Sequence, residues 1–428
     1  MGDIDRRLRD LVPGGAHTYA KGADQYPEGM APVIRRGLGS HVWDTDGREY
    51  IEYGMGLRAV SLGHGHPEVN DAVKTAIDEG LNFVRPSLLE LEAAESFLAT
   101  VPGADMVKFA KNGSDVTTAA VKVARAVTGR ARVVVCGGFI SVDDWWIGST
   151  TLHGGIPDAV RELTHEFAFN DSAGLEDLFA RYRGEIACVI MEGEREEQPA
   201  PGFLDTVRDL CHRNGALFVL DEMVAGRRLA IAGAQELHQI TPDLSTFGKA
   251  LANGFSVSAL AGKREYLEIG SLENRDDSRV FLLSTTHGAE STGLAALLKT
   301  TEIYLRDGVI EHLHAVGAKL RQGVEEVIAE AGLSDHVMLK GRDSNLVYAT
   351  LDRDRQPSQE FRTLLMQELI GRGILAPSLV VSAAHTDQDV EQTVDAFGAA
   401  MVTYAKALEG DVANLLEGRP VRPVFPPH

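Results

Sequence analysis

From about residue 67 onward, stretches with apolar residues at helical spacing alternate with short runs that are apolar throughout. Residues 69–77 and 116–127 place small and β-branched apolar residues three and four positions apart, which predicts amphipathic helices. Residues 133–136, 186–191 and 216–220 are continuously apolar, which is typical of parallel strands covered on both faces. This alternation predicts an α/β fold with a mostly parallel sheet.

The two ends of the chain follow other patterns. Two short β-like runs flank the turn residues 44–47, which predicts a hairpin. Beyond residue 310, a strand over 345–351 and helices over 358–371 and after Asp387 predict a smaller α+β unit, and the prolines after position 419 predict an extended tail. We therefore expect an N-terminal segment joining the small domain (1–62), a large α/β domain (63–310) and a C-terminal small α+β domain (311–428).

Charge and composition exclude several classes of protein. The 428 residues contain 42 Lys and Arg against 62 Asp and Glu, a net charge of −20 that argues against a nucleic-acid partner but not against a local phosphate pocket. The N-terminus lacks the apolar core of a signal peptide, and no apolar run approaches the roughly 18 residues of a membrane span. We expect a soluble, cytoplasmic protein with no membrane partner.

Cysteine and histidine give little reason to expect a metal. Cys136, Cys188 and Cys211 are too few and too scattered for a disulfide framework or a metal site, and free cysteines at such positions are typically buried. His64 and His66 have only the weak H-x-H spacing, in a turn that ends in Pro67. We predict no metal and assign both histidines to a structural turn.

Three features that could carry chemistry fall where strands of the expected sheet end. The first is the segment 111–115, directly before the helix over 116–127. A Gly-Ser turn at a helix N-terminus offers backbone N–H groups and a hydroxyl, which suit a phosphate. An ordinary helix cap by Ser114 or Asp115 explains the same residues, and on this motif alone it is the more common case.

The other two features are an acid and a lysine. Asp221 closes the apolar run 216–220, and an acid at the end of a buried strand needs a cationic partner. Lys249 stands among apolar and small residues, where desolvation lowers the pKa of an amine and makes it a nucleophile. Singly, a capping Asp and a surface Lys are the ordinary interpretations. Together with a phosphate turn, they are the parts that pyridoxal 5′-phosphate (PLP) requires.

The sequence resembles the class III, fold type I aminotransferases, and most closely their glutamate-1-semialdehyde 2,1-aminomutase-like branch. The resemblance extends from residue 12 to residue 389 and includes the segments Trp-Asp-Thr-Asp-Gly at 43–47 and Leu-Gly-His-Gly-His-Pro at 62–67. It implies a PLP enzyme whose large domain, with its mostly parallel sheet, binds the cofactor.

By position, Lys249 matches the family's Schiff-base lysine and Asp221 the partner of the pyridine nitrogen. Gly113 and Ser114 match the phosphate-binding turn. Phe139 lies where the family usually has a Tyr stacked on the cofactor ring, and Phe keeps the stacking face without the phenol.

Two further positions follow from the resemblance. Glu192 matches the acid of the family's Glu-Pro motif, although Gly193 replaces the proline. Thr285 matches a threonine that reaches the phosphate of the neighbouring subunit. If that match holds, the enzyme is a homodimer with shared active sites.

Departures from the family bear on the substrate. True semialdehyde aminomutases share an Asn-Ser-Pro-Val-Arg stretch where this chain has 17–21, and a Phe-Glu-Ala-Gly-Phe insert that is missing after Ser378. These changes put glutamate semialdehyde in doubt as the substrate. Tyr19, Arg58 and Arg228 remain weak candidates for substrate contacts, and the arginines could equally serve structural ion pairs.

We expect an aminotransferase that moves an amino group between an amino-acid donor and a keto or aldehyde acceptor, both small molecules. An intramolecular 2,1-aminomutase acting on a small amino aldehyde needs the same residues, and an amino-acid epimerase of the same fold needs only proton removal and return. A non-catalytic, cofactor-holding protein is a fourth possibility, but it has no need of both Lys249 and Asp221.

Overall fold

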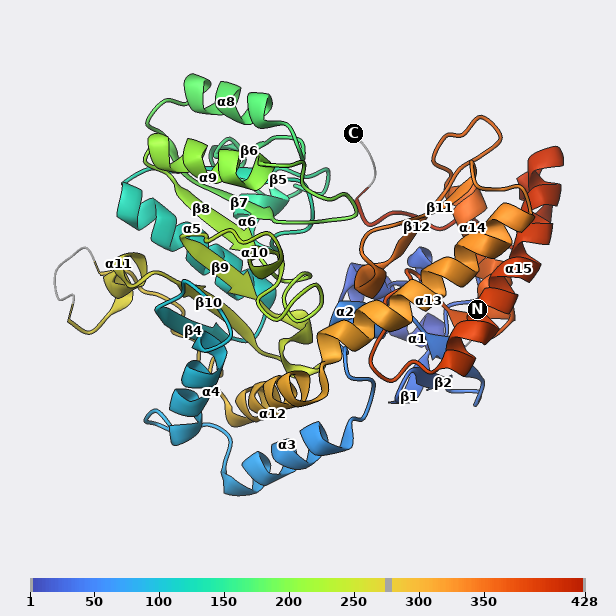
Figure 1. Ribbon diagram of the computed structural model, residues 1–428, viewed down its shortest axis with the longest axis horizontal. Coiled ribbons are helices and arrows are strands. Elements are labelled where there is room, and N and C mark those ends of the chain that lie inside the picture. Colours follow the sequence, from blue (N-terminus) through green and yellow to red (C-terminus); the bar gives the residue numbers. More distant parts are fainter. Residues whose placement is uncertain (1–2, 274–278, 426–428) are drawn as a thin grey trace. The chain divides into compact units, whose positions relative to one another are not determined.

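The computed structural model describes residues 3–273 and 279–425, and the chain divides into two compact units (Figure 1). The small unit comprises Met1–Leu57, Ser61–His66 and Glu311–His428. The large unit comprises Arg58–Val60 and Pro67–Ile310. Within the described residues, no helix is both long and apolar enough to cross a membrane.

The centre of the large unit is a sheet with the strand order β4-β10-β9-β8-β7-β5-β6 in the described part of the chain. The strands from β9 through β8, β7 and β5 to β6 are parallel, whereas β10 runs antiparallel to both β9 and β4. The bounds are β4 Met106–Ala110, β5 Arg132–Cys136, β6 Thr164–Glu166, β7 Ile186–Glu192, β8 Leu217–Asp221, β9 Leu244–Phe247 and β10 Ser258–Gly262. The predicted α/β fold with a mostly parallel sheet is confirmed.

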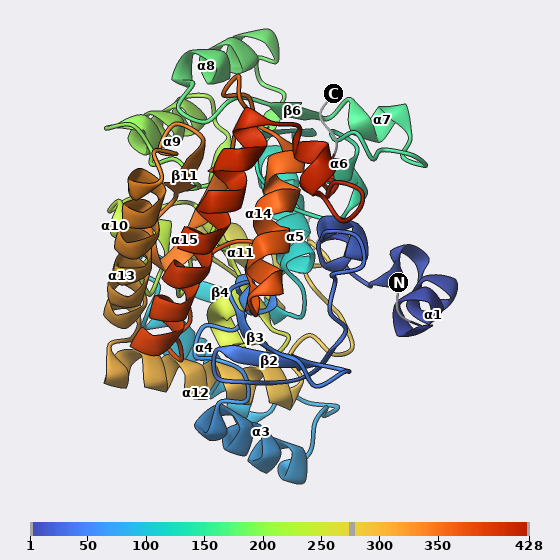
Figure 2. The ribbon, with the colours of Figure 1, turned by 90° about the vertical axis from the view of Figure 1, so that its right-hand side faces the viewer.

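Helices cover both faces of this sheet, which is why its central strands are apolar throughout. Side chains of α8 and α9 form one buried core with side chains of β5, β7 and β8. Helix α5 lies on the other side of the sheet (Figure 2). The three cysteines are buried and unpaired, as expected.

The helices of the large unit are α3 Pro67–Glu79, α4 Leu88–Leu98, α5 Gly113–Thr128, α6 Asp144–Ile147, α7 Asp158–Arg161, α8 Ser172–Arg181, α9 Phe203–Arg213, α10 Ala234–Leu237, α11 Arg264–Leu267 and α12 Ser291–Asp307. Short 3-10 turns add Lys249–Ala252 and Glu268–Gly270. The two helices expected over 69–77 and 116–127 are confirmed as α3 and α5.

The small unit contains the predicted hairpin. Strands β2 and β3 are antiparallel, and Asp44 Oδ1 accepts the N–H groups of Asp46 and Arg48 at 3.0 and 2.8 Å, which closes the turn. The sheet order is β1-β2-β3-β13, and β11 pairs with β12 separately. The strands are β1 Ile34–Leu38, β2 His41–Asp44, β3 Glu49–Glu52, β11 Val337–Lys340, β12 Val347–Thr350 and β13 Ile374–Leu375.

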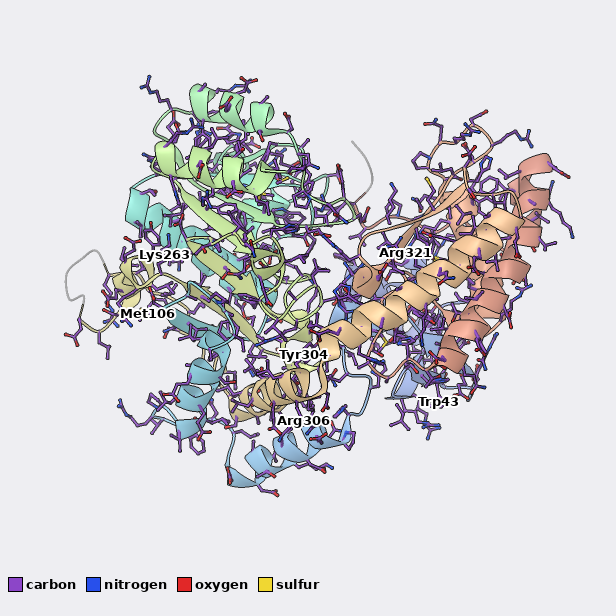
Figure 3. The ribbon with its side chains drawn as sticks, viewed as in Figure 1. Trp43, Met106, Lys263, Tyr304, Arg306 and Arg321 are labelled. Carbon is purple, nitrogen blue, oxygen red and sulfur yellow. The ribbon has the colours of Figure 1, made fainter. Side chains whose placement is uncertain are left out.

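The helices of the small unit are α1 Asp3–Leu11, α2 Met55–Arg58, α13 Val309–Glu330, α14 Gln359–Gly371 and α15 Asp387–Glu409, with α2 and α13 crossing into the large unit. Its short 3-10 turns are Pro13–Gly15, Tyr19–Lys21, Ala23–Gln25, Asp343–Asn345 and Val412–Leu415. Arg321 of α13 (Figure 3) pairs with Asp343 at 2.6 Å. His64 pairs with Glu52 at 3.0 Å, which agrees with a structural turn.

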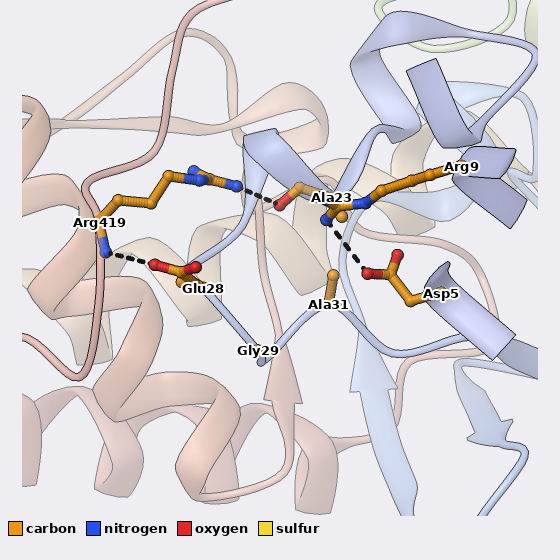
Figure 4. Close-up of a pocket in the computed structure, with 7 residues that line it drawn as sticks. All are labelled: Asp5, Arg9, Ala23, Glu28, Gly29, Ala31 and Arg419. Atoms are coloured by element: carbon orange, nitrogen blue, oxygen red, sulfur yellow. Dashed lines mark hydrogen bonds and ion pairs between the residues drawn. The ribbon is translucent and has the colours of Figure 1, made fainter. Parts of the chain in front are cut away.

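A small polar hollow in this unit lies where the C-terminal segment meets the N-terminal one (Figure 4). The backbone N–H of Arg419 donates to Glu28 at 3.0 Å, and its guanidinium donates to the carbonyl of Ala23 at 3.2 Å. The hollow is lined by none of the residues assigned a role above. The last three residues of the predicted tail lie outside the described residues.

Candidate active site

Asp221 ends β8, at the carboxyl edge of the parallel strands where ligands of open α/β sheets bind. Its side chain is 1% exposed. Oδ1 accepts the N–H of Met223 and the hydroxyl of Thr246, both at 3.0 Å, whereas no described group bonds to Oδ2. Burial and the nearby Glu192 raise the pKa of Asp221 to about 7, although the nearby Lys249 and the two hydrogen bonds to Oδ1 oppose this effect.

Glu192 ends β7 and is the register partner of Asp221 on the neighbouring strand. Its carboxylate forms an ion pair with Arg195 at 3.3 Å. Burial raises the pKa of Glu192, against the opposing effects of Lys249, Arg195 and Arg58. Two acids therefore stand side by side at the sheet edge, surrounded by cations.

Lys249 follows β9 directly and opens a short 3-10 turn. Its φ of +43° is in the left-handed region, which is unusual for a residue with a side chain and is common at functional sites. Burial lowers the pKa of Lys249, and Asp221 and Glu192 oppose this effect. The structure thus brings Lys249, Asp221 and Glu192 together at the ends of three adjacent parallel strands.

The N-terminus of α5 is held on several sides. Asn112 donates its N–H to Asp115 Oδ2 at 2.8 Å, and its carbonyl accepts the hydroxyl of Ser258 at 2.8 Å. Ser114 does not cap the helix, because its Oγ accepts the N–H of Val142 at 2.9 Å. The N-cap of α5 is Asn112, and Asp115 accepts the Asn112 N–H from the third helical position as part of a capping box, so neither Ser114 nor Asp115 is itself the N-cap.

Met223 connects this turn to the lysine. A Cβ added at Gly113 would lie 2.8 Å from Met223 Sδ, and one added at Gly248 would lie 2.7 Å from the same sulfur. Both glycines are therefore required for close packing around Met223, whose backbone N–H also holds Asp221. The Gly113–Ser114 turn, Asp221 and the segment that carries Lys249 therefore all contact Met223.

Phe139 lies in the loop that follows β5, with its ring edge-to-face on Trp146 at a centroid distance of 5.1 Å. The ring is 50% exposed. Thr285 is exposed in the segment before α12, where its carbonyl accepts the N–H of Gly288. Tyr19, 63% exposed, belongs to the small unit. No interaction described here joins Thr285 or Tyr19 to the Lys249 cluster.

The arginines differ sharply in exposure. Arg58 is half-buried and faces Glu192 and Glu196, and burial lowers its pKa. Arg228 is completely buried and donates to the carbonyl of Arg58 at 3.4 Å. Arg227 is also buried, and its guanidinium donates to the hydroxyls of Thr100 and Thr301 at 2.8 and 3.4 Å.

Sequence reasoning missed four residues of this site: Arg195, Thr246, Met223 and Glu222. Glu222 is buried and accepts the N–H groups of Ala234 and Gln235, each at 2.8 Å, and burial raises its pKa to about 8. Its position next to Asp221 was the available signal, because a second acid at the end of a buried strand requires an explanation of its own.

This fold and this edge of the sheet define a PLP-dependent transferase of fold type I. Residues 22–396 match the family described as Aminotransferase class-III, and the chain belongs to that family. It is 31% identical over 411 residues to the 3-aminobutyryl-CoA aminotransferase of Cloacimonas acidaminovorans (strain Evry), with 94% of this chain and 96% of the relative covered.

The chain is also 32% identical over 430 residues to the glutamate-1-semialdehyde 2,1-aminomutase of Thermomicrobium roseum (strain ATCC 27502 / DSM 5159 / P-2), with 95% of this chain and 98% of the relative covered. Among solved structures, the PLP internal aldimine form of the FumI protein of Sphingopyxis sp. MTA144 superposes with a TM-score of 0.86 at 28% identity, covering 98% of each chain. The protein is therefore a PLP-dependent enzyme of amino-group transfer or aminomutation.

The residues at the sheet edge fit PLP. The unpaired Oδ2 of Asp221 suits the protonated pyridine nitrogen, since a cation there favours the ionised carboxylate and opposes the effect of burial on its pKa. The α5 N-terminus suits the phosphate. Within the described residues, no group of three or more His, Cys, Asp or Glu side chains is placed to hold a metal ion.

Proposed function

We propose that this enzyme is an intermolecular aminotransferase in which Lys249 is the residue that links to PLP. The observation that carries the proposal is the buried Oδ2 of Asp221, unpaired at the end of β8 beside a lysine whose pKa burial has lowered. A protein without catalytic activity has no reason to maintain such an acid and such a lysine together.

Bound at this edge, PLP supplies a carbonyl that links to amines and a ring that withdraws electrons from the amine-bearing carbon. Asp221 Oδ2 holds the proton on the ring nitrogen, and Thr246 and Met223 fix the carboxylate through Oδ1. Lys249, whose pKa is lowered by burial, would act as the base that takes the proton from the amine-bearing carbon of the substrate.

The remaining chain residues would orient the cofactor. Gly113 and Ser114 would offer the first-turn N–H groups of α5 to the phosphate, helped by the positive end of the helix dipole. Phe139 would provide an aromatic face for stacking on the ring. Glu192 pairs with Arg195 and lies near Arg58.

Recognition of the substrate carboxylate falls to the two half-buried arginines near Glu192. Arg58 and Arg195 both face the single carboxylate of Glu192, so a substrate carboxylate can share their N–H donors. Arg228 is completely buried and supports the backbone of Arg58, so we assign it a positioning role. This arrangement favours amino-acid donors over simple amines.

We further propose a homodimer in which Thr285 completes the phosphate site of the neighbouring subunit. The segment before and within α4 exposes several large apolar side chains, and a second copy of this chain is the partner we propose to cover them. These side chains are Leu81, Phe83, Val84, Leu88 and Leu91. We place the enzyme in a reducing compartment such as the cytoplasm, since its three cysteines are unpaired.

The test is the absorbance spectrum of the PLP-loaded protein, recorded after each of a panel of amino donors with no acceptor present. We expect the cofactor band to change with an amino-acid donor and to return when a keto acid is added. Lys249→Ala is the control and should lose the band of the linked cofactor and at least about 1,000-fold in activity.

Other results of this experiment would favour the alternative functions. A band unchanged by every donor, with interconversion of an amino aldehyde, would indicate an aminomutase. Exchange of the α-proton without net transfer would indicate an epimerase. A wild-type protein that binds PLP and turns over nothing would contradict enzymatic function altogether.

A further inference from the structure

The first two turns of α5 carry a row of hydroxyl groups that all bond to one loop. Ser114, Thr117 and Thr118 contact residues 140–145, which follow β5 by only a few positions. The same loop carries Phe139. Helix α5 therefore holds the loop with the same end that faces the phosphate.

Thr118 is the centre of this row. Its hydroxyl donates to Asp143 Oδ2 and accepts the indole N–H of Trp145 at 2.7 Å. Ser141 Oγ lies 3.4 Å from the same hydroxyl and accepts the N–H of Asp143 at 3.1 Å. One hydroxyl thus bonds to Ser141 and Asp143 of the loop after β5 and to the indole of Trp145 in the short helix α6 that follows this loop.

The hydroxyls of Thr117 and Ser114 also form hydrogen bonds between α5 and this loop. Thr117 donates to the carbonyl of Ile140 at 3.1 Å, and Ser114 accepts from Val142 at 2.9 Å. Gly137 and Gly138 precede these residues at φ values of +50° and +76°, and the two hydroxyls attach the loop to α5 directly after Phe139. Phe139 sits directly between those glycines and the attached residues.

The contact between Phe139 and Trp146 links these hydrogen bonds to the Phe139 ring. Trp146 is buried and directly follows Trp145, and Phe139 packs edge-to-face on it. Phe139 thus contacts the residue next to Trp145, so a shift of Trp145 or Asp143 after loss of the Thr118 hydroxyl can reach the Phe139 ring through Trp146. A half-exposed ring on a mobile loop would have to be ordered at a cost in affinity each time a ligand stacked on it.

We propose that Thr118 is a positioning residue that acts through Asp143 and Trp145 to hold Phe139 ready for stacking on the cofactor ring. This proposal rests on the proposed function, because it requires PLP at the α5 N-terminus with Phe139 on its ring. It goes further in assigning a specific role to a side chain that contacts neither the phosphate turn nor the lysine.

The experiment compares three full-length variants made free of cofactor. Thr118→Val keeps the shape and removes both hydrogen bonds, Thr118→Ser keeps the hydroxyl, and Thr128→Val is the matched control. Thr128 is at the other end of α5, where its hydroxyl bonds to the carbonyl of Ala124 at 2.7 Å and accepts the N–H of Arg130. Equilibrium dialysis measures the Kd for PLP, competition measures the Ki for inorganic phosphate, and visible circular dichroism reports the orientation of the bound ring.

We expect Thr118→Val to raise the Kd for PLP about 10-fold and to reduce the visible dichroism, with the phosphate Ki changed by less than about two-fold. Thr118→Ser and Thr128→Val should resemble the wild type. In a Phe139→Ala background, Thr118→Val should have no further effect, because the residue through which it acts is gone.

Other results overturn the proposal. Equal weakening of PLP and phosphate would mean that Thr118 acts on the turn, and additivity with Phe139→Ala would mean that it does not act through the ring. Failure of Thr118→Ser to restore binding would assign the effect to the methyl group. A wild-type protein that does not bind PLP would instead contradict the proposed function.

If Thr118→Val does not fold, a second variant still tests the proposal. Trp145→Phe removes the indole N–H that Thr118 accepts, together with part of the buried ring, and leaves the bond from Thr118 to Asp143 in place. It should raise the Kd for PLP about three-fold and leave the phosphate Ki unchanged. An unchanged Kd for PLP in this variant would also overturn the proposal.

Discussion

The two oxygens of Asp221 have different surroundings, and the difference decides how this residue behaves. Oδ1 is fully engaged by Thr246 and Met223, so the carboxylate cannot turn to find another partner. Oδ2 is buried and unpaired, and the raised pKa follows from that burial. The apoprotein therefore holds a carboxylate that is costly to ionise until a cation reaches it.

This cost predicts a pH-dependent gain in stability for Asp221→Asn in the apoprotein. The pKa of Asp221 rises from about 3.8 to about 7 on folding, so wild-type stability falls as pH rises from about 4 to 7. The asparagine does not titrate. The advantage of the variant should grow by about 2 kcal/mol between pH 5 and pH 8.

Urea unfolding of both apoproteins at the two pH values measures this effect. With PLP bound, the order should reverse, because asparagine cannot keep the ring nitrogen protonated. A constant difference between the two apoproteins at both pH values would show that Asp221 is not the titrating group.

A second prediction at the scale of single residues concerns Arg227. Its buried guanidinium donates to two hydroxyls, and no ion pair with a carboxylate is found for it among the described residues. Replacing a buried charge by an apolar side chain of similar size is often stabilising. Arg227→Met should raise stability by about 1–3 kcal/mol, measured by urea unfolding, whereas Arg227→Ala should lower it by leaving a cavity. A large loss of stability in Arg227→Met would instead show that the charge has a function.

At the scale of elements, the start of α5 and the segment after β9 meet at Met223. Gly113→Ala should therefore weaken PLP binding and lower stability by about 1–3 kcal/mol, because its Cβ would overlap Met223 Sδ. Combining it with Met223→Ala should cost less than the two single changes together. Strict additivity in thermal unfolding would show that the two residues are not in conflict.

The helices and strands also show which parts of the fold can be predicted from the local pattern of apolar residues. The runs 133–136, 186–191 and 216–220 became β5, β7 and β8 because continuous apolar character over such lengths is satisfied only between two layers. The strand expected over 345–351 is shorter, Val347–Thr350, since residues 343–345 form a 3-10 turn. The local pattern therefore predicted that these elements exist, but it predicted their first and last residues less accurately.

At the scale of the whole molecule, the homodimer proposal predicts that two defective variants repair each other. Lys249→Ala and Thr285→Ala homodimers should each be impaired. In a mixed dimer, one site has both substitutions and the other has neither, because Lys249 and Thr285 of one site come from different subunits.

Unfolding and refolding an equal mixture should restore roughly a quarter of the wild-type sites, measured as activity. Mixing without refolding is the control. Activity no higher than the average of the two variants would place Thr285 in the same site as its own Lys249, or in no site. Val84→Asp, in the exposed apolar segment, should shift the protein toward monomers in size-exclusion chromatography and lower its activity.

The sequence by itself determined the α/β architecture and the residue types that could carry the chemistry. Buried strands must be apolar along their length, and an acid or a lysine beside such a run is conspicuous in any linear reading. Gly113, Asp221 and Lys249 were therefore identifiable as candidates before their geometry was known. Their roles at the site remain to be tested by the experiments above.

Only the tertiary structure decided what surrounds these residues. It showed that Thr246 holds one oxygen of Asp221, that Met223 packs against both glycines, and that Arg228 is completely buried. These facts depend on contacts between segments far apart along the chain, which hydrophobic pattern does not encode. A buried arginine and an exposed one look the same in a sequence, because their difference lies entirely in the neighbours that folding brings to them.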